Sequence, residues 1–241
     1  MLFERCGHFI CWIYRNHFQE LQLMRWVWFF LSIVTLLIAW TGPLPELSEK
    51  AFFGHMIMHM LNVAIAAPLF SLALAGGKFD LTAKYPLLFA PIPAAVVELI
   101  VVWGWHAPLP HHFAREQTIG FIAEQGSFFI CGVWLWLSAF GGEGSEKPGV
   151  HLRKQRRQGA GIIGLLLTAM HMTFLGALLG LAPRPLYPHH SGYASLGPLE
   201  DQHLGGAIML IVGAIAYLAG GLYLARKMMK PKKTAKLLEA T

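Results

Sequence analysis

Two histidines four residues apart mark the stretch GHMIMHMLNVAIAAP, residues 54–68, as the part of the chain best suited to metal chemistry. Residues spaced by four share one face of a helix, so His55 and His59 lie one above the other. Met58 shares that face, and Met60 directly follows His59. Imidazoles and thioethers are soft ligands that are costly to place in an apolar segment. We therefore predict a metal site here, although an imidazole can also simply bond a carbonyl of a neighbouring helix.

Further polar residues of this kind lie in or beside other apolar stretches. His106 follows Trp-Gly-Trp and is either a ligand or a cap of a helix end, and His171 is either a ligand or a core histidine. Asp201 precedes the last apolar stretch, where it either caps that helix or holds an imidazole in place. The full set of candidate metal ligands is His55, Met58, His59, Met60, His106, Glu124, His171, Asp201 and His203.

This donor set favours copper. Imidazole with thioether suits Cu(I), and Cu(II) and Zn remain possible. The few carboxylates make Mg or Ca a poor match. Haem b is the competing cofactor, with His59 and either His171 or His106 as axial ligands. The chain contains none of the common hydrolase or phosphate-binding motifs, so we do not expect an enzyme of those classes.

The elements that must position these residues are membrane-spanning helices. The 241 residues are 55% hydrophobic and only 13% charged, with a mean hydropathy of +0.50, whereas soluble domains carry roughly a quarter charged residues. A helix needs about 20 apolar residues to cross a bilayer. The sequence therefore predicts an all-α polytopic membrane protein with six transmembrane helices, at Met24–Trp40, Phe52–Ala75, Pro86–Trp105, Gln117–Phe140, Gly159–Ala182 and Gly205–Ala225.

The distribution of basic residues predicts the orientation. If both termini are cytoplasmic, sixteen of the nineteen Lys and Arg residues lie on the inner side, as the positive-inside rule requires. The net charge of +6 then serves topology and contact with membrane lipid, and no nucleic-acid partner is expected. We divide the chain into an amphipathic interfacial segment (1–23), a six-helix domain (24–225) and a basic cytoplasmic tail (226–241).

This orientation places eight of the twelve histidines on the outer side. The tandem pairs His111–His112 and His189–His190 are expected to be solvated rather than functional. In the third span, Glu98 is expected to face the bundle, and Pro91 and Pro93 are expected to interrupt the helix. Because broken helices and buried charges mark transport pathways, these features leave a copper or small-solute transporter open. Pro68 is expected to bend the second span.

Several short motifs in the order found here resemble the CtaG-type cytochrome c oxidase assembly factors of bacteria. They are His55-Met56-x-x-His59-Met60, Ala66-Ala67-Pro68-Leu69, Trp105-His106-x-Pro108, Pro185-Leu186-Tyr187 and Asp201-Gln202-x-x-Gly205-Gly206-x-x-Met209. The resemblance covers about residues 25–225. It implies a multi-pass protein of the bacterial inner membrane that supports copper insertion into the oxidase, with oxidase subunits or other copper chaperones as partners.

Carried onto this sequence, the resemblance implies that His55, His59 and His106 bind metal and that Asp201 supports them. The chain departs from the family pattern in its fourth span, where Gln125 and Phe121 stand at positions expected to be histidine. The sequence thus leads to a non-enzymatic copper-handling assembly factor. The alternatives are a haem b-binding oxidoreductase component and a transporter.

Overall fold

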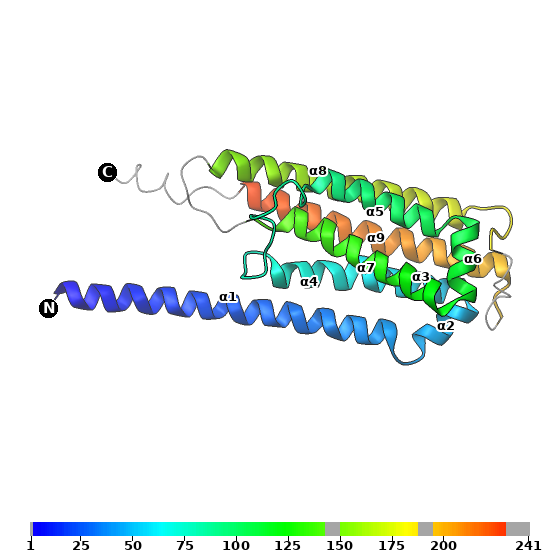
Figure 1. The fold of residues 1–241 in the computed structure, drawn as a ribbon, viewed down its shortest axis with the longest axis horizontal. Coiled ribbons are helices and arrows are strands. Elements are labelled where there is room, and N and C mark those ends of the chain that lie inside the picture. Colours follow the sequence, from blue (N-terminus) through cyan, green and yellow to red (C-terminus); the bar gives the residue numbers. More distant parts are fainter. Residues whose placement is uncertain (1, 143–149, 188–194, 230–241) are drawn as a thin grey trace.

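Helices make up most of the part of the chain that the structure describes. The computed structural model describes the backbone of residues 2–142, 150–187 and 195–229, and these ranges form helices and no strand (Figure 1). The elements are α1 (Leu2–Trp40), α2 (Leu44–Lys50), α3 (Phe52–Met60), the π-helix η1 (Leu61–Ala66), α4 (Ala67–Leu74), α5 (Pro91–Trp105), α6 (Pro108–Glu116), α7 (Thr118–Phe140), α8 (Val150–Gly180) and α9 (Pro198–Met229). The predicted all-α class is confirmed.

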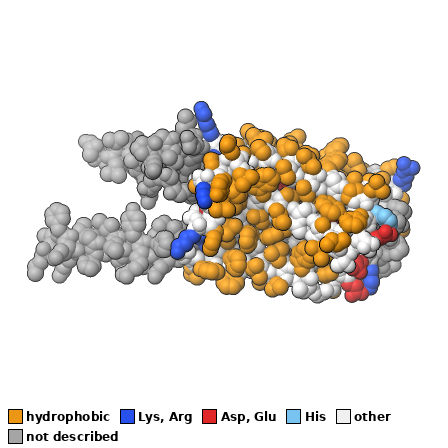
Figure 2. All heavy atoms as spheres, viewed as in Figure 1, with side chains coloured by type: hydrophobic (Ala, Val, Ile, Leu, Met, Phe, Trp, Pro, Cys, Tyr) orange, Lys and Arg blue, Asp and Glu red, His pale blue; other side chains and the backbone are white. Residues whose placement is uncertain are grey.

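Five continuous helical stretches are long and apolar enough to cross a membrane. They are Gln22–Trp40, Phe52–Leu74, Thr118–Phe140, Gln155–Gly180 and Pro198–Met229. A sixth span results if α5 and α6, which meet at a bend of 70°, count as one. Many large apolar side chains on the outside of the bundle are exposed, as expected for a surface that faces lipid (Figure 2). The chain is therefore a polytopic membrane protein.

The third predicted span differs from the expectation. Residues 86–89 form turns and α5 begins at Pro91. Pro91 and Pro93 therefore lie in the first turn of this helix, and the expected interruption of the helix by these prolines is wrong. Proline is favoured at the first helical position because its missing N–H would have no partner there. With only 15 residues, α5 is shorter than the about 20 residues that cross a bilayer, and it passes the length and hydropathy test only together with the bent helix α6.

Pro68 changes the second span in a different way. It lies in the first turn of α4, directly after η1, and the backbone N–H of Ala67 bonds the carbonyl of Asn62, five residues earlier. The proline lacks an N–H, and the helix takes up the irregularity as one wider turn. This turn contains Asn62, a fully buried side chain that reaches toward the candidate site.

Close helix packing and one polar cluster hold the bundle together. Gly176 and Gly180 on α8 face Gly206 on α9, where a Cβ atom on Gly206 would come within 2.5 Å of the Gly180 nitrogen. At the level of Glu98, three helices join: its carboxylate accepts hydrogen bonds of 2.8 Å from both Thr168 on α8 and Tyr217 on α9. Glu98 is fully buried, as expected.

The two ends of the bundle differ. The amino end of α1 and the carboxyl end of α9 lie at the same end, and α6 closes the other (Figure 1). Helix α1 passes residue 23 without a break, and residues 230–241 lie outside the described part of the chain. The proposed division into an interfacial segment, a membrane domain and a tail therefore stays a prediction.

Candidate metal centre

Three buried side chains from three helices converge at the end of the bundle that carries α6. His55 on α3, His111 on α6 and Glu124 on α7 each offer one ligand atom, and these atoms all lie within 4.8 Å of one another. The three residues are at most 2% exposed. His55 Nε2 lies 3.5 Å from Glu124 Oε1. Two imidazoles and a carboxylate at this separation form a possible metal site.

His111 corrects an expectation, because it is buried in this cluster rather than solvated. Helix α6 turns 70° away from α5 and lies across the end of the bundle. The His111 ring packs against the Tyr187 ring, with centroids 4.1 Å apart, and lies 5.4 Å from the His55 ring. The side chain of its neighbour His112 is 37% exposed, and its Nε2 lies 3.2 Å from Glu116 Oε1. His189 and His190 lie outside the described residues.

Glu124 is held by a buried ion pair. The Arg115 guanidinium donates through Nη2 to Glu124 Oε2 at 2.8 Å and through Nη1 to the carbonyl of Ser48 at 3.0 Å. The same guanidinium lies 5.4 Å from the centroid of the Phe121 ring. Arg115 thus fixes one oxygen of Glu124 and leaves the other, Oε1, on the side of His55.

A relay of amides reaches the site from α1. Trp40 Nε1 donates to Asn62 Oδ1 at 3.2 Å, and Asn62 Nδ2 donates to Gln125 Oε1 at 2.9 Å. Because an indole can only donate, it fixes the orientation of both amides. Gln125 Nε2 then donates to Glu124 Oε2 at 3.2 Å and faces His55 Nδ1 at 3.5 Å. Gln125 therefore connects α1 and η1 to two members of the cluster.

A second pair of imidazoles adjoins the first group. His59 and His106 have ring centroids 5.5 Å apart, and the His106 ring lies 6.5 Å from that of His55. His106 Nδ1 donates to the carbonyl of Val102 at 2.7 Å, which leaves Nε2 as the ligand atom. The Phe128 ring covers His59, with centroids 4.0 Å apart. Three of the predicted histidines thus lie together, with His111 as a fourth.

Asp201 has a role that differs from both alternatives considered. It lies in the first turn of α9 rather than at its cap, and its two carboxylate oxygens accept from the backbone N–H groups of Phe52 and Phe53, at 2.8 and 2.9 Å. It therefore caps α3, the helix that carries His55 and His59. A negative side chain at this position stabilises the helix end without touching an imidazole.

Of the other predicted ligands, His171 and His203 are not among the three side chains whose ligand atoms converge. His171 is buried on α8, and His203 Nε2 donates to the carbonyl of Ala182 at 2.9 Å. Met58 and Met60 are buried, and Met60 packs in the apolar core. Metal binding by these four residues stays a prediction.

Unsatisfied nitrogen and oxygen atoms support the fit of a metal to this region. Among the described residues, His55 Nε2, both ring nitrogens of His59, His106 Nε2 and Glu124 Oε1 are buried without a hydrogen-bond partner. A buried polar group without a partner costs free energy, of the order of 1–3 kcal/mol each. Several such atoms on adjacent side chains are the arrangement that a metal ion would satisfy.

Sequence analysis missed His111 and Arg115, although one signal was present. The two residues are four apart and so share one face of a helix over residues 108–116. His112 and Glu116, each one residue further along, share a neighbouring and more exposed face with the same spacing. Pairing the residues by helical period, rather than as a tandem His-His, separates the buried pair from the exposed pair.

Comparison with known proteins gives a family. The model of the cytochrome c oxidase caa3 assembly factor family matches residues 9–231, nearly the whole chain. No curated protein and no solved structure matches significantly. Because the match covers far more than half of the 241 residues, the chain belongs to the cytochrome c oxidase caa3 assembly factor family.

Proposed function

We propose that this protein binds copper at His55, His111 and Glu124 and supports its insertion into cytochrome c oxidase. The main support is the convergence of these three buried side chains from separate helices, with ligand atoms within 4.8 Å of one another. His59 and His106 extend the site by two further imidazoles. Copper is the cargo, and imidazole is among its preferred protein ligands.

Such a site suits an assembly factor rather than an enzyme. The chain binds the ion, excludes water from it and releases it to a client, and none of these steps makes or breaks a covalent bond of a substrate. The partners are oxidase subunits or other copper chaperones in the same membrane. We place the protein in the bacterial inner membrane, with both termini cytoplasmic and the site near the periplasmic surface, because this orientation satisfies the positive-inside rule.

Copper content tests the proposal directly. The detergent-solubilised protein is loaded with copper, desalted and analysed by mass spectrometry of the metal. We expect stoichiometric copper in the wild type and in the matched control His112→Ala, whose side chain is partly exposed and does not belong to the convergent group. The double variant His55→Ala/His111→Ala should lose this copper. Equal copper in all three proteins contradicts the proposal.

The same preparation separates the alternatives. A haem b protein that uses His59 with His171 or His106 shows a Soret band in its visible spectrum, whereas a copper site of this kind shows none. The features that suggested a transporter have structural explanations: Pro91 starts a helix, and both oxygens of Glu98 accept hydrogen bonds. Metal uptake into proteoliposomes would nevertheless favour a carrier.

A further inference from the structure

A fixed positive charge adjoins the candidate metal site. Arg115 Nη2 lies 2.8 Å from Glu124 Oε2, and the other oxygen of that carboxylate lies 3.5 Å from His55 Nε2. We propose that Arg115 is a specificity-determining residue that makes this site accept monovalent Cu(I) and reject divalent ions such as Zn(II) and Cu(II). This inference rests on the proposed function, since it concerns the same site.

The ligands alone would not make this choice. Two neutral imidazoles and a carboxylate are the set found in zinc enzymes, and imidazole also binds Cu(II). The single negative charge of Glu124 would attract a divalent ion more strongly than a monovalent one. A selectivity for Cu(I) therefore needs a feature beyond the three donors.

Arg115 supplies that feature through charge. A guanidinium stays protonated, so it balances the carboxylate and leaves the site with no net charge before the metal arrives. A monovalent ion then brings the buried site to one positive charge and a divalent ion brings it to two. The repulsion by Arg115 and the free-energy cost of burying net charge both rise with the charge of the ion. The binding free energy of a divalent ion is therefore weakened more than that of a monovalent ion.

The guanidinium is held in place and cannot easily withdraw. Its side chain is 7% exposed and also donates to the carbonyl of Ser48 at 3.0 Å, and the Phe121 ring lies beneath it. Glu49 also lies within Coulombic range of Arg115, but it is exposed, so water screens it. Among the described residues near the ligands, Arg115 is therefore the cation that sets the local charge.

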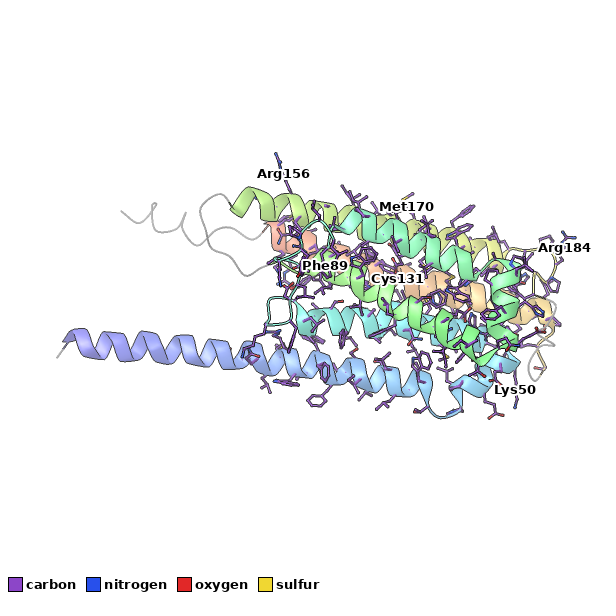
Figure 3. All side chains as sticks on the ribbon, in the orientation of Figure 1. Lys50, Phe89, Cys131, Arg156, Met170 and Arg184 are labelled. Atoms are coloured by element: carbon purple, nitrogen blue, oxygen red, sulfur yellow. The ribbon has the colours of Figure 1, made fainter. Side chains whose placement is uncertain are left out.

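Competition between two metals measures the effect. The dissociation constants of Cu(I) and Zn(II) are determined with competing chelators for wild type, Arg115→Gln and Arg115→Lys, with thermal unfolding to confirm that each variant folds. We expect Arg115→Gln to strengthen Zn(II) binding relative to Cu(I) by at least about tenfold. Arg115→Lys, which keeps the charge, should retain most of the wild-type preference. Arg184→Gln, at the same end of the molecule but exposed, should change neither constant (Figure 3).

The outcomes separate this inference from the proposed function. If the wild type binds copper but the ratio of the two constants is the same in all variants, the role of Arg115 is wrong and the copper site stands. If Arg115→Lys behaves like Arg115→Gln, the guanidinium acts through its hydrogen bonds, and selection by charge is refuted. If the wild type binds neither metal, both proposals fall.

Discussion

At the scale of single residues, Asp201 shows how a side chain supports the site without being a ligand. Both of its oxygens accept backbone N–H groups at the start of α3, and it is fully buried. The cap holds the first turn of the helix whose next turns carry His55 and His59. The four N–H groups at a helix start have no partner within the helix, so a carboxylate there is stabilising.

Replacing Asp201 should therefore destabilise the protein more than it changes any ligand. We expect Asp201→Ala to lower the free energy of unfolding by about 2–3 kcal/mol, because two hydrogen bonds to a charged group are lost inside the bundle. Thermal unfolding in detergent gives the measurement. The neighbouring Glu200→Ala is the control, since Glu200 is exposed and its carboxylate accepts a hydrogen bond from the backbone N–H of Gly197. Equal melting temperatures for the two variants would argue against the cap.

Part of the site could be predicted from the sequence, because ligands that belong to the same helix recur at the helical spacing of three or four residues. His55 and His59 could be predicted in this way, and His106 was marked by its place between an aromatic end and a proline. The partners Arg115 and Gln125 were not predicted, because their roles depend on a bend of 70° between α5 and α6 and on contacts between distant helices. Long-range pairs of this kind leave no periodic signal in a single sequence.

At the scale of elements, α8 and α9 pack through glycine. A Cβ atom on Gly206 would lie 2.5 Å from the Gly180 nitrogen and 2.7 Å from the Gly176 carbonyl oxygen. These neighbours are backbone atoms that cannot rotate away, so the helices would have to separate. By contrast, a Cβ atom on Gly213 of the same helix would meet Met172 Cβ at 3.6 Å, an ordinary contact.

This difference gives a matched pair of variants. Gly206→Ala should lower the free energy of unfolding by about 1–3 kcal/mol, the usual cost of overpacking. Gly213→Ala should be neutral or slightly stabilising, because alanine favours the helix and finds room. The two melting temperatures in detergent test the prediction, which fails if Gly206→Ala is as stable as Gly213→Ala.

The loop after α4 is tied to the end of α7 by Asp80. Its carboxylate accepts from the hydroxyl and backbone of Thr82 and from the backbone of Gly76 and Gly142, the last two at 2.7 and 3.0 Å. Partial burial disfavours the charged form, but these hydrogen bonds outweigh it and lower the pKa of Asp80 below its ordinary value. The ionised carboxylate of Asp80 therefore stabilises this loop.

The pH dependence of stability follows from that direction. Because the pKa is lower in the folded than in the unfolded chain, the contribution of Asp80 is complete above the unfolded value of about 3.9 and is lost as the pH falls through the folded value. We expect Asp80→Asn to melt at a lower temperature than wild type at pH 7, and the gap to narrow below about pH 4. A gap that stays constant or widens in acid would be inconsistent with an ionised Asp80.

Hydropathy predicted where the membrane helices lie but not where they end. The structure begins α8 at Val150 and α9 at Pro198, earlier than the predicted spans at Gly159 and Gly205. Backbone hydrogen bonds can continue a helix into polar sequence, whereas hydropathy identifies only the apolar residues that can lie in the hydrocarbon core of the membrane. The third span was misjudged for another reason, since a proline pair at a helix start has the same composition as one within a helix.

At the scale of the whole molecule, the two ends have different chemistry. The apolar surface separates one end that carries Lys and Arg from another where Asp, Glu and His side chains gather together with basic ones (Figure 2). The first end holds the start of α1 and the end of α9, and the second holds α6 and the candidate site (Figure 1). The start of α1 and the end of α9 on one side agree with an even number of spans, which favours counting the bent pair α5–α6 as the sixth.

The remaining question at this scale is which end faces the cytoplasm, and two labelled positions can answer it. Lys50 lies at the end with α6 and Arg156 at the opposite end (Figure 3), and both side chains are exposed. In a chain whose three native cysteines are replaced, Lys50→Cys and Arg156→Cys are each treated on intact cells with a maleimide that cannot cross the inner membrane. The positive-inside rule predicts labelling of Lys50→Cys alone, with Arg156→Cys labelled only after the cells are opened. The reverse pattern would turn the candidate site toward the cytoplasm, where copper would have to reach it from the inner side of the membrane.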